Sequence, residues 1–271
     1  MAQIINTNIQ SLNAQRNLNT SQNSLSTSLQ RLSSGLRVNS SKDDAAGLAV
    51  AEKMNAQALG MTVAIRNAND GLSLAQTAEA GMNVIGEHLQ RMRTLAVQAA
   101  SGQYDSDNRG ALDTEYQALA SEIDRVISAT NFNGQKLLDG TLSGLIFQVG
   151  ATTTDESKIK MSIGAMSFGA GTVSGSSGDA ALSAIATLDK QINTLNTNRA
   201  ALGAIQNRFE GVLTQLSAAH ENTTAARSRI MDADYASETA GLARAQVLQQ
   251  AGVAMLSQAN ALPQNVLSLL R

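Results

Sequence analysis

The stretch LDKQINTLNTNRAALGAIQNRFEGVLTQL, residues 188–216, decides the fold. Apolar residues stand in it at strict seven-residue spacing: Leu188, Leu195, Leu202, Phe209 and Leu216. An apolar heptad sustained this long predicts a long helix that packs lengthwise against another helix. Arg199 and Gln206 interrupt the companion positions of this stripe.

Two more segments upstream carry an apolar stripe of the same kind. The first covers residues 71–102, and its stripe consists of Ala75, Ala78, Met82, Ile85, Leu89, Met92, Ala96 and Ala99. The second covers residues 105–130, with Leu112, Tyr116, Leu119, Ile123 and Val126 at steps of four and three. Both patterns predict amphipathic helices, and Gly102 is expected to close the first.

Both ends of the chain are apolar and almost free of charge. Residues 1–30 contain one charged side chain, Arg16, and residues 245–270 contain none. The apolar positions are Ile5, Ile9, Leu12, Leu25, Leu29 and Leu32 near the start and Leu248, Met255, Leu262, Val266, Leu269 and Leu270 near the end. Gly252 and Ala259 lie beside the second stripe and allow close helix approach. The apolar stripe at each end predicts a helix of about 30–40 residues, and each helix needs a partner that buries the stripe.

The junctions between these segments have recognisable helix signals. Gly35 is expected to end the first helix. Ser41 and Asp44 have the spacing of a capping box, and Asp43 with Asp44 suits the positive end of the next helix. Asp179 is predicted to cap the helix that contains the heptad.

The middle of the chain reads differently. Asn133-Gly134 and Asp139-Gly140 are turn dipeptides, and residues 145–150 and 157–164 read as two short strands that form a hairpin. Residues 164–179 are rich in Gly and Ser and predict a loop. The fold class is therefore mainly α: a long antiparallel, coiled-coil-like helical bundle with a small β-hairpin, in which the N- and C-terminal helices pair.

Composition excludes several kinds of function. The chain is 43% hydrophobic, only 3% aromatic, free of Cys and has a net charge of -2. These values give no case for nucleic acid, disulfides or thiol chemistry. No Sec-type signal peptide and no membrane-spanning stretch is present in the sequence. His88 and His220 lie far apart and no catalytic, metal or cofactor motif occurs, so we expect no enzyme and no cofactor.

One small cluster lies off the stripes. Arg91 and Leu95 are four residues apart, outside the stripe of their helix, and are expected to share an outward face. Glu115 is off the stripe of the following helix. From the residues alone, a solvated face with one exposed leucine is a better account of the cluster than a partner site, because one small patch is weak evidence.

The chain contains a series of long motifs in a fixed order. They are INTN (5–8), SLNAQRNL (11–18), LSSGLRVNSSKDDAAGLAV (32–50), GLSLAQTAE (71–79), LQRMRTLAVQAASG (89–102), TNFNGQKLL (130–138), RSRIMDADYASE (227–238), RAQVLQQAG (244–252) and QANALPQNVLSLLR (258–271). In these motifs the chain closely resembles bacterial flagellin, the filament subunit of the flagellum, over nearly its whole length.

The resemblance implies a domain organisation. Residues 1–43 and 232–271 would form an inner helical domain, residues 44–141 and 180–231 an outer helical domain, and residues 142–179 the hairpin and loop that complete it. Large inserted surface domains are missing, so the chain looks like a minimal flagellin. The resemblance also implies export to the cell exterior without a Sec signal.

The resemblance further implies partners. These are other copies of the chain in a helical polymer, the flagellar type III export apparatus, an export chaperone for the C-terminal segment, and the filament cap and hook-junction proteins. In flagellins sensed by the animal flagellin-recognising Toll-like receptor, an Arg, a Leu and a Glu matter at the positions of Arg91, Leu95 and Glu115. Receptor binding would require released monomer.

The functional hypothesis is structural: a monomer polymerises by burying its ends, which are expected to be loose beforehand. The polymer interface would be formed by the twelve apolar end residues named above. Two alternatives stay open, a hook–filament junction protein with similar ends and a secreted adhesin or immune-active ligand. Pro263 is expected to kink or restart the last helix without ending it.

Overall fold

The computed structural model describes the backbone of residues 7–142, 144–169 and 171–268, and side chains within these ranges up to residue 261. The chain forms two compact units. We call the described residues up to Ala56, together with those from Asn222, the terminal unit, and Gln57–Glu221 the central unit. The predicted domain boundaries at 43/44 and 231/232 coincide with breaks between helices, whereas the units divide within two long helices.

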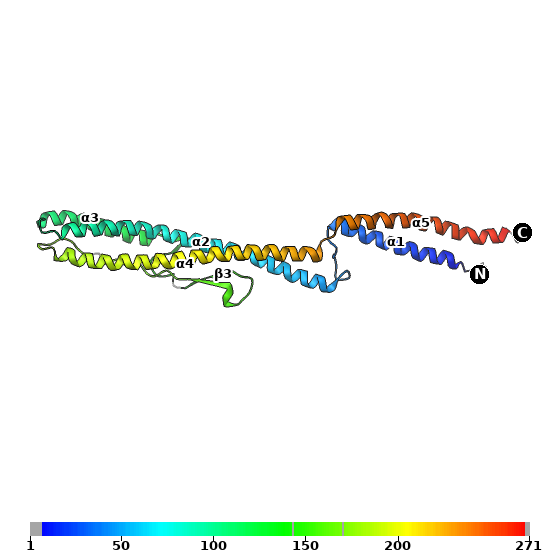
Figure 1. Ribbon diagram of the computed structural model, residues 1–271, viewed down its shortest axis with the longest axis horizontal. Helices are drawn as coiled ribbons and strands as arrows, with labels where there is room; N and C mark the ends of the chain where they lie inside the picture. The colour runs from blue at the N-terminus through cyan, green and yellow to red at the C-terminus, as the bar shows by residue number, and fades with distance from the viewer. Residues whose placement is uncertain (1–6, 143, 170, 269–271) are drawn as a thin grey trace. The chain divides into compact units, whose positions relative to one another are not determined.

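The terminal unit is built on an antiparallel pair of helices, α1 (Ile9–Ser34) and α5 (Tyr235–Ser268), which lie side by side in Figure 1. Asn8 caps α1 by accepting a hydrogen bond from the Ser11 amide, and Gly35 ends it in the left-handed conformation, at φ 71°. The predicted pairing of the two ends is confirmed. With 26 residues, α1 is shorter than expected, while α5 has 34 and continues through Pro263.

Small residues and leucines share the seam between α1 and α5. Its buried and half-buried positions recur at steps of three and four: Ser11, Ala14, Leu18, Ser21, Leu25, Ser28 and Leu32 on α1, and Leu242, Ala245, Gln249, Gly252, Leu256 and Ala259 on α5. At Gly252 an added Cβ would lie only 3.2 Å from Leu18 Cδ1. The two backbones therefore approach closely, as the predicted role of Gly252 and Ala259 requires.

Two connections complete the terminal unit: residues 35–44 join α1 to α2 (Ala45–Ala99), and residues 232–234 join α4 (Asp179–Met231) to α5. Asp44 caps α2, because its carboxylate accepts a hydrogen bond of 2.8 Å from the Gly47 amide. The predicted capping box with Ser41 is therefore wrong. Asp43 instead holds the loop before the helix, where it binds the amides of Asn39 and Ser40.

The central unit contains most of α2 and α4, together with α3 (Ser106–Ala129). Arg93 bonds Asp189, and Gln206 bonds Glu79, so the sequence runs in opposite directions along α2 and α4. The predicted stripe of α2 is fully buried, and so are Leu188, Leu195, Leu202 and Phe209 of the α4 heptad. Tyr116, Ile123 and Val126 of α3 complete this core. The heptad thus packs as its spacing predicts.

Two short hairpins follow α3. β1 (Asn131–Phe132) and β2 (Gln135–Lys136) flank the turn Asn133-Gly134, where both residues have positive φ, 50° and 80°. β3 (Leu145–Gln148) pairs antiparallel with β4 (Lys158–Met161), with the 3-10 turn η1 (Asp155–Ser157) between them. The predicted hairpin is confirmed, and its Phe147 ring meets Phe209 of α4 edge to face at 5.5 Å.

The predicted loop lies between β4 and α4, and it packs on the core through Met166 and Val173. Gly178, rather than Asp179, precedes α4 as its cap residue, because the Gly178 carbonyl accepts the first helical hydrogen bond from Leu182. Arg109 of α3 holds this region: it is 4% exposed and donates hydrogen bonds to the carbonyls of Ala99, Ser101, Gly175 and Ser176.

Candidate assembly surface

The outward faces of the terminal unit also carry large apolar side chains. On α1, Ile9 is 63% exposed and Leu12 and Leu29 are 50% exposed. Their neighbour Ser11 is buried against α5. Near its start α1 therefore turns a small polar residue toward α5 and leaves two large apolar residues in water, the reverse of the arrangement in a helix whose own chain buries its apolar face.

The same reversal occurs on α5. Leu248 and Met255, seven residues apart, are 51% and 64% exposed, while the seam positions between them are Gln249 and Gly252. Val247 and Val253 are exposed as well. Sequence reasoning missed these two valines because they lie outside the heptad that the larger side chains define.

The predicted interface residues fall into three groups. Ile9, Leu12, Leu29, Leu248 and Met255 are exposed. Leu25 and Leu32 are half-buried in the seam with α5, so the structure gives them a role within the chain. Ile5, Leu269 and Leu270 lie outside the described residues. Leu262 and Val266 lie in the last part of α5, and only the backbone of that part is described.

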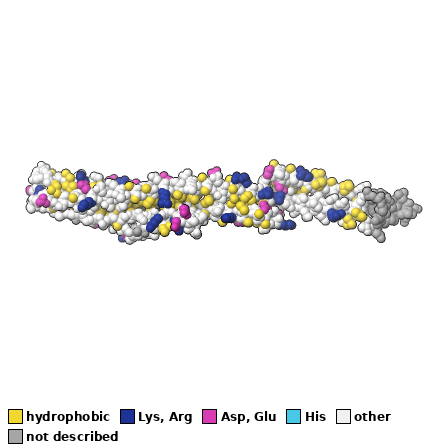
Figure 2. All heavy atoms as spheres, turned by 60° about the horizontal axis from the view of Figure 1, so that its bottom comes forward, with side chains coloured by type: hydrophobic (Ala, Val, Ile, Leu, Met, Phe, Trp, Pro, Cys, Tyr) yellow, Lys and Arg dark blue, Asp and Glu magenta, His cyan; other side chains and the backbone are white. Residues whose placement is uncertain are grey.

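Few charges interrupt these faces. Figure 2 shows apolar side chains among uncharged polar ones along the terminal unit, with scattered charged groups. Arg16 is the one charged residue between Ile9 and Gln30, and residues 245–261 have none. Another apolar surface could therefore cover them with little desolvation of charge.

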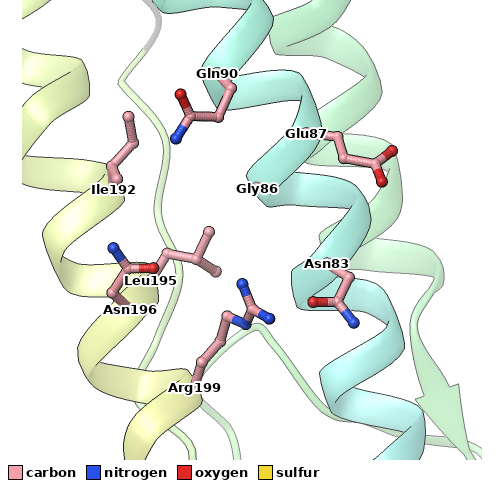
Figure 3. Close-up of a pocket in the computed structure, with 8 residues that line it drawn as sticks. All are labelled: Asn83, Gly86, Glu87, Gln90, Ile192, Leu195, Asn196 and Arg199. Carbon is pink, nitrogen blue, oxygen red and sulfur yellow. The ribbon is translucent and has the colours of Figure 1, made fainter.

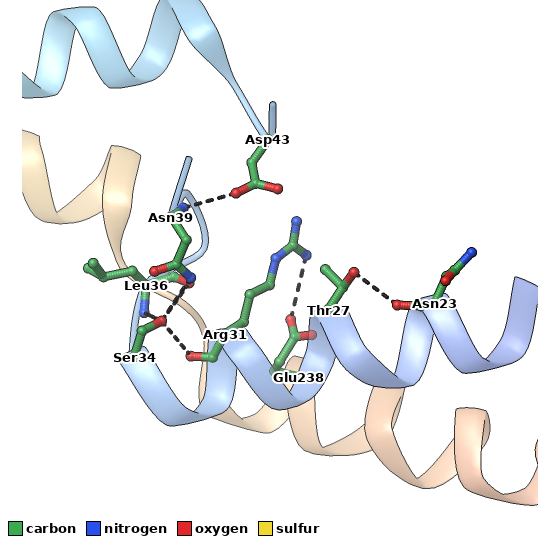
Figure 4. Close-up of polar contacts among 8 residues, drawn as sticks. All are labelled: Asn23, Thr27, Arg31, Ser34, Leu36, Asn39, Asp43 and Glu238. Carbon is green, nitrogen blue, oxygen red and sulfur yellow. Dashed lines mark hydrogen bonds and ion pairs between the residues drawn. The ribbon is translucent and has the colours of Figure 1, made fainter. Parts of the chain in front are cut away.

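Hydrogen bonds align the α1–α5 pair along its length. At one end Asn8 Nδ2 donates to the Ala259 carbonyl at 2.7 Å, and Ser11 Oγ donates to Asn260 Oδ1 at 2.7 Å. At the other end Tyr235 Oη donates to the Leu32 carbonyl at 3.1 Å. Arg31 lies 3.8 Å from Glu238 (Figure 4). These contacts set the register that small seam residues leave weakly specified.

The second predicted site is on the central unit. Arg91 on α2 and Glu115 on α3 face each other, with 2.7 Å between Arg91 Nη2 and a Glu115 carboxylate oxygen. Both side chains are about half exposed, 57% and 46%. The expectation that Leu95 shares this outward face is wrong, because Leu95 is 1% exposed and belongs to the core. Its side of α2 is covered by packing within the central unit.

A hollow opens in the central unit between α2 and α4, with a volume of about 610 Å³ (Figure 3). Gly86, Glu87, Gln90 and Asn83 line one wall, and Ile192, Leu195, Asn196 and Arg199 line the other. Its walls combine one carboxylate, one guanidinium and three amides, without a nucleophile beside a base. The hollow therefore offers polar contacts and no arrangement for catalysis.

Among the described residues, no group of three or more His, Cys, Asp or Glu side chains is placed to hold a metal ion. In the same ranges, no helix combines the length and hydropathy needed to cross a membrane. What the described surface presents is apolar faces on helices.

Comparisons with known proteins agree with this picture. Models of the bacterial flagellin N-terminal and C-terminal helical regions match residues 5–143 and 185–270. A flagellin of Halalkalibacterium halodurans is 43% identical over 99% of this chain and 100% of its own length. A flagellin of Bacillus subtilis is 39% identical over 98% of this chain and 99% of its own length.

The fold also occurs among solved structures. An example is a putative flagellar hook-associated protein from Vibrio parahaemolyticus, with a TM-score of 0.61 and 13% identity over 70% of this chain and 100% of that one. At that identity the likeness concerns the fold alone, and the family rests on the sequence relatives. The chain belongs to the bacterial flagellin family, whose members are structural, non-enzymatic subunits of the extracellular flagellar filament.

Proposed function

We propose that the chain polymerises through two separate faces of its terminal unit. The first face contains Ile9 and Leu12 of α1, and the second contains Leu248 and Met255 of α5. The proposal rests on the second apolar face of each helix: after the seam between α1 and α5 is packed, Ile9, Leu12, Leu248 and Met255 stay exposed.

Burial of these side chains supplies the driving force. A fully buried Leu, Ile or Met side chain contributes roughly 1.5–3 kcal/mol relative to water. Part of this gain offsets the conformational entropy lost when helices are fixed between neighbours. Because the two faces consist of different residues, contact of one with the other is head-to-tail, and such contacts that do not close a ring build a helical polymer.

A double variant tests the proposal, Leu248→Gln with Met255→Gln. Since neither side chain belongs to the seam, we expect the circular dichroism spectrum of the monomer to stay unchanged. Filaments in electron micrographs after salt-induced assembly should be lost. The matched control is Val97→Gln with Leu182→Gln, which removes two similarly exposed apolar residues of the central unit, 50% and 58%. Normal filaments from the Leu248/Met255 variant, or their loss from the control alone, would contradict the proposal.

The same exposure supports a proposal about partners before assembly. An apolar stripe on α5 invites aggregation unless something covers it. We infer that an export chaperone binds α5 while the chain awaits the type III export apparatus, and that the cap and hook-junction proteins meet the same faces in the filament. The Leu248/Met255 double variant should then also fail to co-elute with the chaperone; undiminished co-elution would refute this assignment.

We also propose that the released monomer is a ligand of the flagellin-sensing Toll-like receptor, through the face that presents Arg91 and Glu115. Leu95 would act indirectly, as a core residue that fixes α2 beneath them. Arg91→Ala and Glu115→Ala should reduce receptor activation without moving the thermal midpoint, because exposed ion pairs add little stability. Leu95→Ala should cost about 2–5 kcal/mol of stability.

Leu95→Met separates contact from support. The substitution keeps the volume and apolar character, so it should preserve both stability and activation. If Leu95→Met abolishes activation in a stably folded chain, Leu95 contacts the receptor directly and the supporting role is wrong. If Arg91→Ala leaves activation intact, the face itself is wrong.

A further inference from the structure

Two helix breaks of the terminal unit lie side by side. Residues 35–44 separate α1 from α2, and residues 232–234 separate α4 from α5. Leu36 and Asp232 form an antiparallel bridge. The Met231 carbonyl accepts from the Arg37 amide at 2.6 Å, and the Gly35 carbonyl accepts from the Ala233 amide at 2.9 Å. The two breaks therefore hold each other in a single arrangement, which we call the crossover.

A small apolar cluster supports the crossover from one side. Val38 is 1% exposed, Ala51 of α2 is 1% exposed and Met231 is 4% exposed. Leu36, Leu48 and Ile230 pack around them. This cluster is small compared with the core of the central unit, so the shape of the 35–44 loop depends strongly on its hydrogen bonds.

One carboxylate organises that loop. Asp43 Oδ2 accepts hydrogen bonds from the Asn39 amide at 3.1 Å, the Ser40 amide at 3.0 Å and the Ser40 hydroxyl at 3.1 Å. Asn39 in turn donates from Nδ2 to Ser34 Oγ and to the Leu36 carbonyl at the end of α1 (Figure 4). The Asp43 carboxylate thus connects the start of α2 to the end of α1, and it is open to solvent protons.

These bonds favour the charged carboxylate. The Asn39 amide, then the Ser40 hydroxyl and amide, and finally the charge of Arg31 lower the pKa of Asp43 below its ordinary value. Arg31 lies on α1 and also approaches Glu238 of α5. The other charged groups of the segments that meet here are Arg37, Lys42 and Asp44 in the loop, Arg227 and Arg229 at the end of α4, and Asp232 and Asp234 before α5.

The sign of the effect follows from linkage. Because the folded crossover binds a proton at Asp43 less readily than the unfolded chain, the stabilisation is fully present above the ordinary aspartate pKa, about 3.9. It is lost as the pH falls through the lowered pKa of the folded state. The effect is therefore confined to acid conditions.

We propose that Asp43 makes the crossover an acid-sensitive hinge, in which protonation releases the three hydrogen bonds that shape residues 39–43 and loosens the link between α1 and α2. The hinge is a property of the single chain and does not depend on polymerisation. We expect acid to loosen it before the packing of α2 on α4 in the central unit, because that core consists of apolar side chains.

Amide hydrogen exchange of the full-length chain tests the hinge. At neutral pH, Asp43→Asn mimics the protonated carboxyl group, and the amides of Asn39 and Ser40 should exchange several-fold faster than in the wild type. Asp43→Ala removes the side-chain acceptor altogether, so its exchange rates at Asn39 and Ser40 set the upper limit for the effect. Amides near Ile85 and Leu195 in the central core should be unaffected. Equal exchange in Asp43→Asn and the wild type would show that charge is not needed and would overturn the proposal.

A pH titration gives an independent readout. In the wild type, the amide resonances of Asn39 and Ser40 should shift together with one midpoint below about 3.9, the ordinary aspartate value. Asp43→Asn should abolish that transition. The control is Asp124→Asn, which changes an exposed aspartate of α3 in the central unit and should leave the transition in place. A transition that persists in Asp43→Asn would assign the response to another group and refute the hinge.

Discussion

Arg109 holds a buried positive charge among backbone carbonyls. Its guanidinium bonds Ala99 at the end of α2 and reaches Ser176 before α4, so one side chain ties three segments of the central unit. Arg109→Ala leaves these carbonyls without a donor. Since hydrogen bonds to charged groups contribute about 1.5–3 kcal/mol, we expect a loss of about 3 kcal/mol of stability and faster proteolysis within residues 171–178.

Arg109→Lys is the sharper comparison. A lysine ammonium is a compact point charge. It cannot reach the carbonyls of both Ala99 and Ser176 as the planar guanidinium of Arg109 does. Most of the loss should therefore remain, as measured by denaturant unfolding followed by circular dichroism. Arg125→Ala, which removes an exposed pair with Glu122, should change little. A fully stable Arg109→Lys chain would show that charge alone suffices.

Leu95 shows where residue-level prediction fails. Its spacing places it off the Leu89/Met92/Ala96 stripe, yet it is as buried as they are. α2 is contacted by both α3 and α4, so its buried face is wider than one stripe. A heptad pattern identifies one seam, and a second neighbour becomes visible only in three dimensions.

At the scale of elements, glycines offer a matched test of packing on α2 and α4. An alanine Cβ at Gly71 would lie 2.6 Å from the Phe209 ring, whereas at Gly203 nothing lies within 4 Å. Gly71→Ala should therefore push Phe209 away and destabilise by about 1–3 kcal/mol, despite the better helix propensity of alanine. Gly203→Ala should stabilise by up to about 1 kcal/mol. Thermal unfolding of the two variants measures the difference, and equal shifts would mean that Phe209 has room to move.

The sequence was enough to predict that the helices exist, but not at which residue each one starts. Regular stripes predicted α2, α3 and α4, since amphipathic periodicity depends only on the sequence. The starts depend on neighbours. Asp44 caps α2 by itself, while Asp43 shapes a loop that packs on α4. Position 178 before α4 requires glycine, because an added Cβ would lie 2.8 Å from the Ala100 carbonyl oxygen.

At the scale of the whole molecule, the sequence predicted that both ends pair and that apolar residues remain for other copies. It did not predict which apolar residues line the internal seam and which remain exposed. Leu25 and Leu32 line the internal seam, whereas Leu248 and Met255 point away from it. The seam of α5 contains small residues at Ala245 and Gly252, and these allow close contact with α1. Such a division is decided by packing and is not encoded in hydropathy.

Removal of residues 263–271 tests the role of the chain's end. The deletion leaves the seam contacts from Leu242 to Ala259 and the whole central unit in place. We expect the circular dichroism spectrum to lose little helical signal and filaments to disappear from electron micrographs. Pro263→Ala is the control: it changes one residue, keeps the chain length and should assemble normally. Normal filaments from the deletion would restrict assembly to the exposed faces before residue 262, whereas loss from both variants would make the backbone at Pro263 the decisive element.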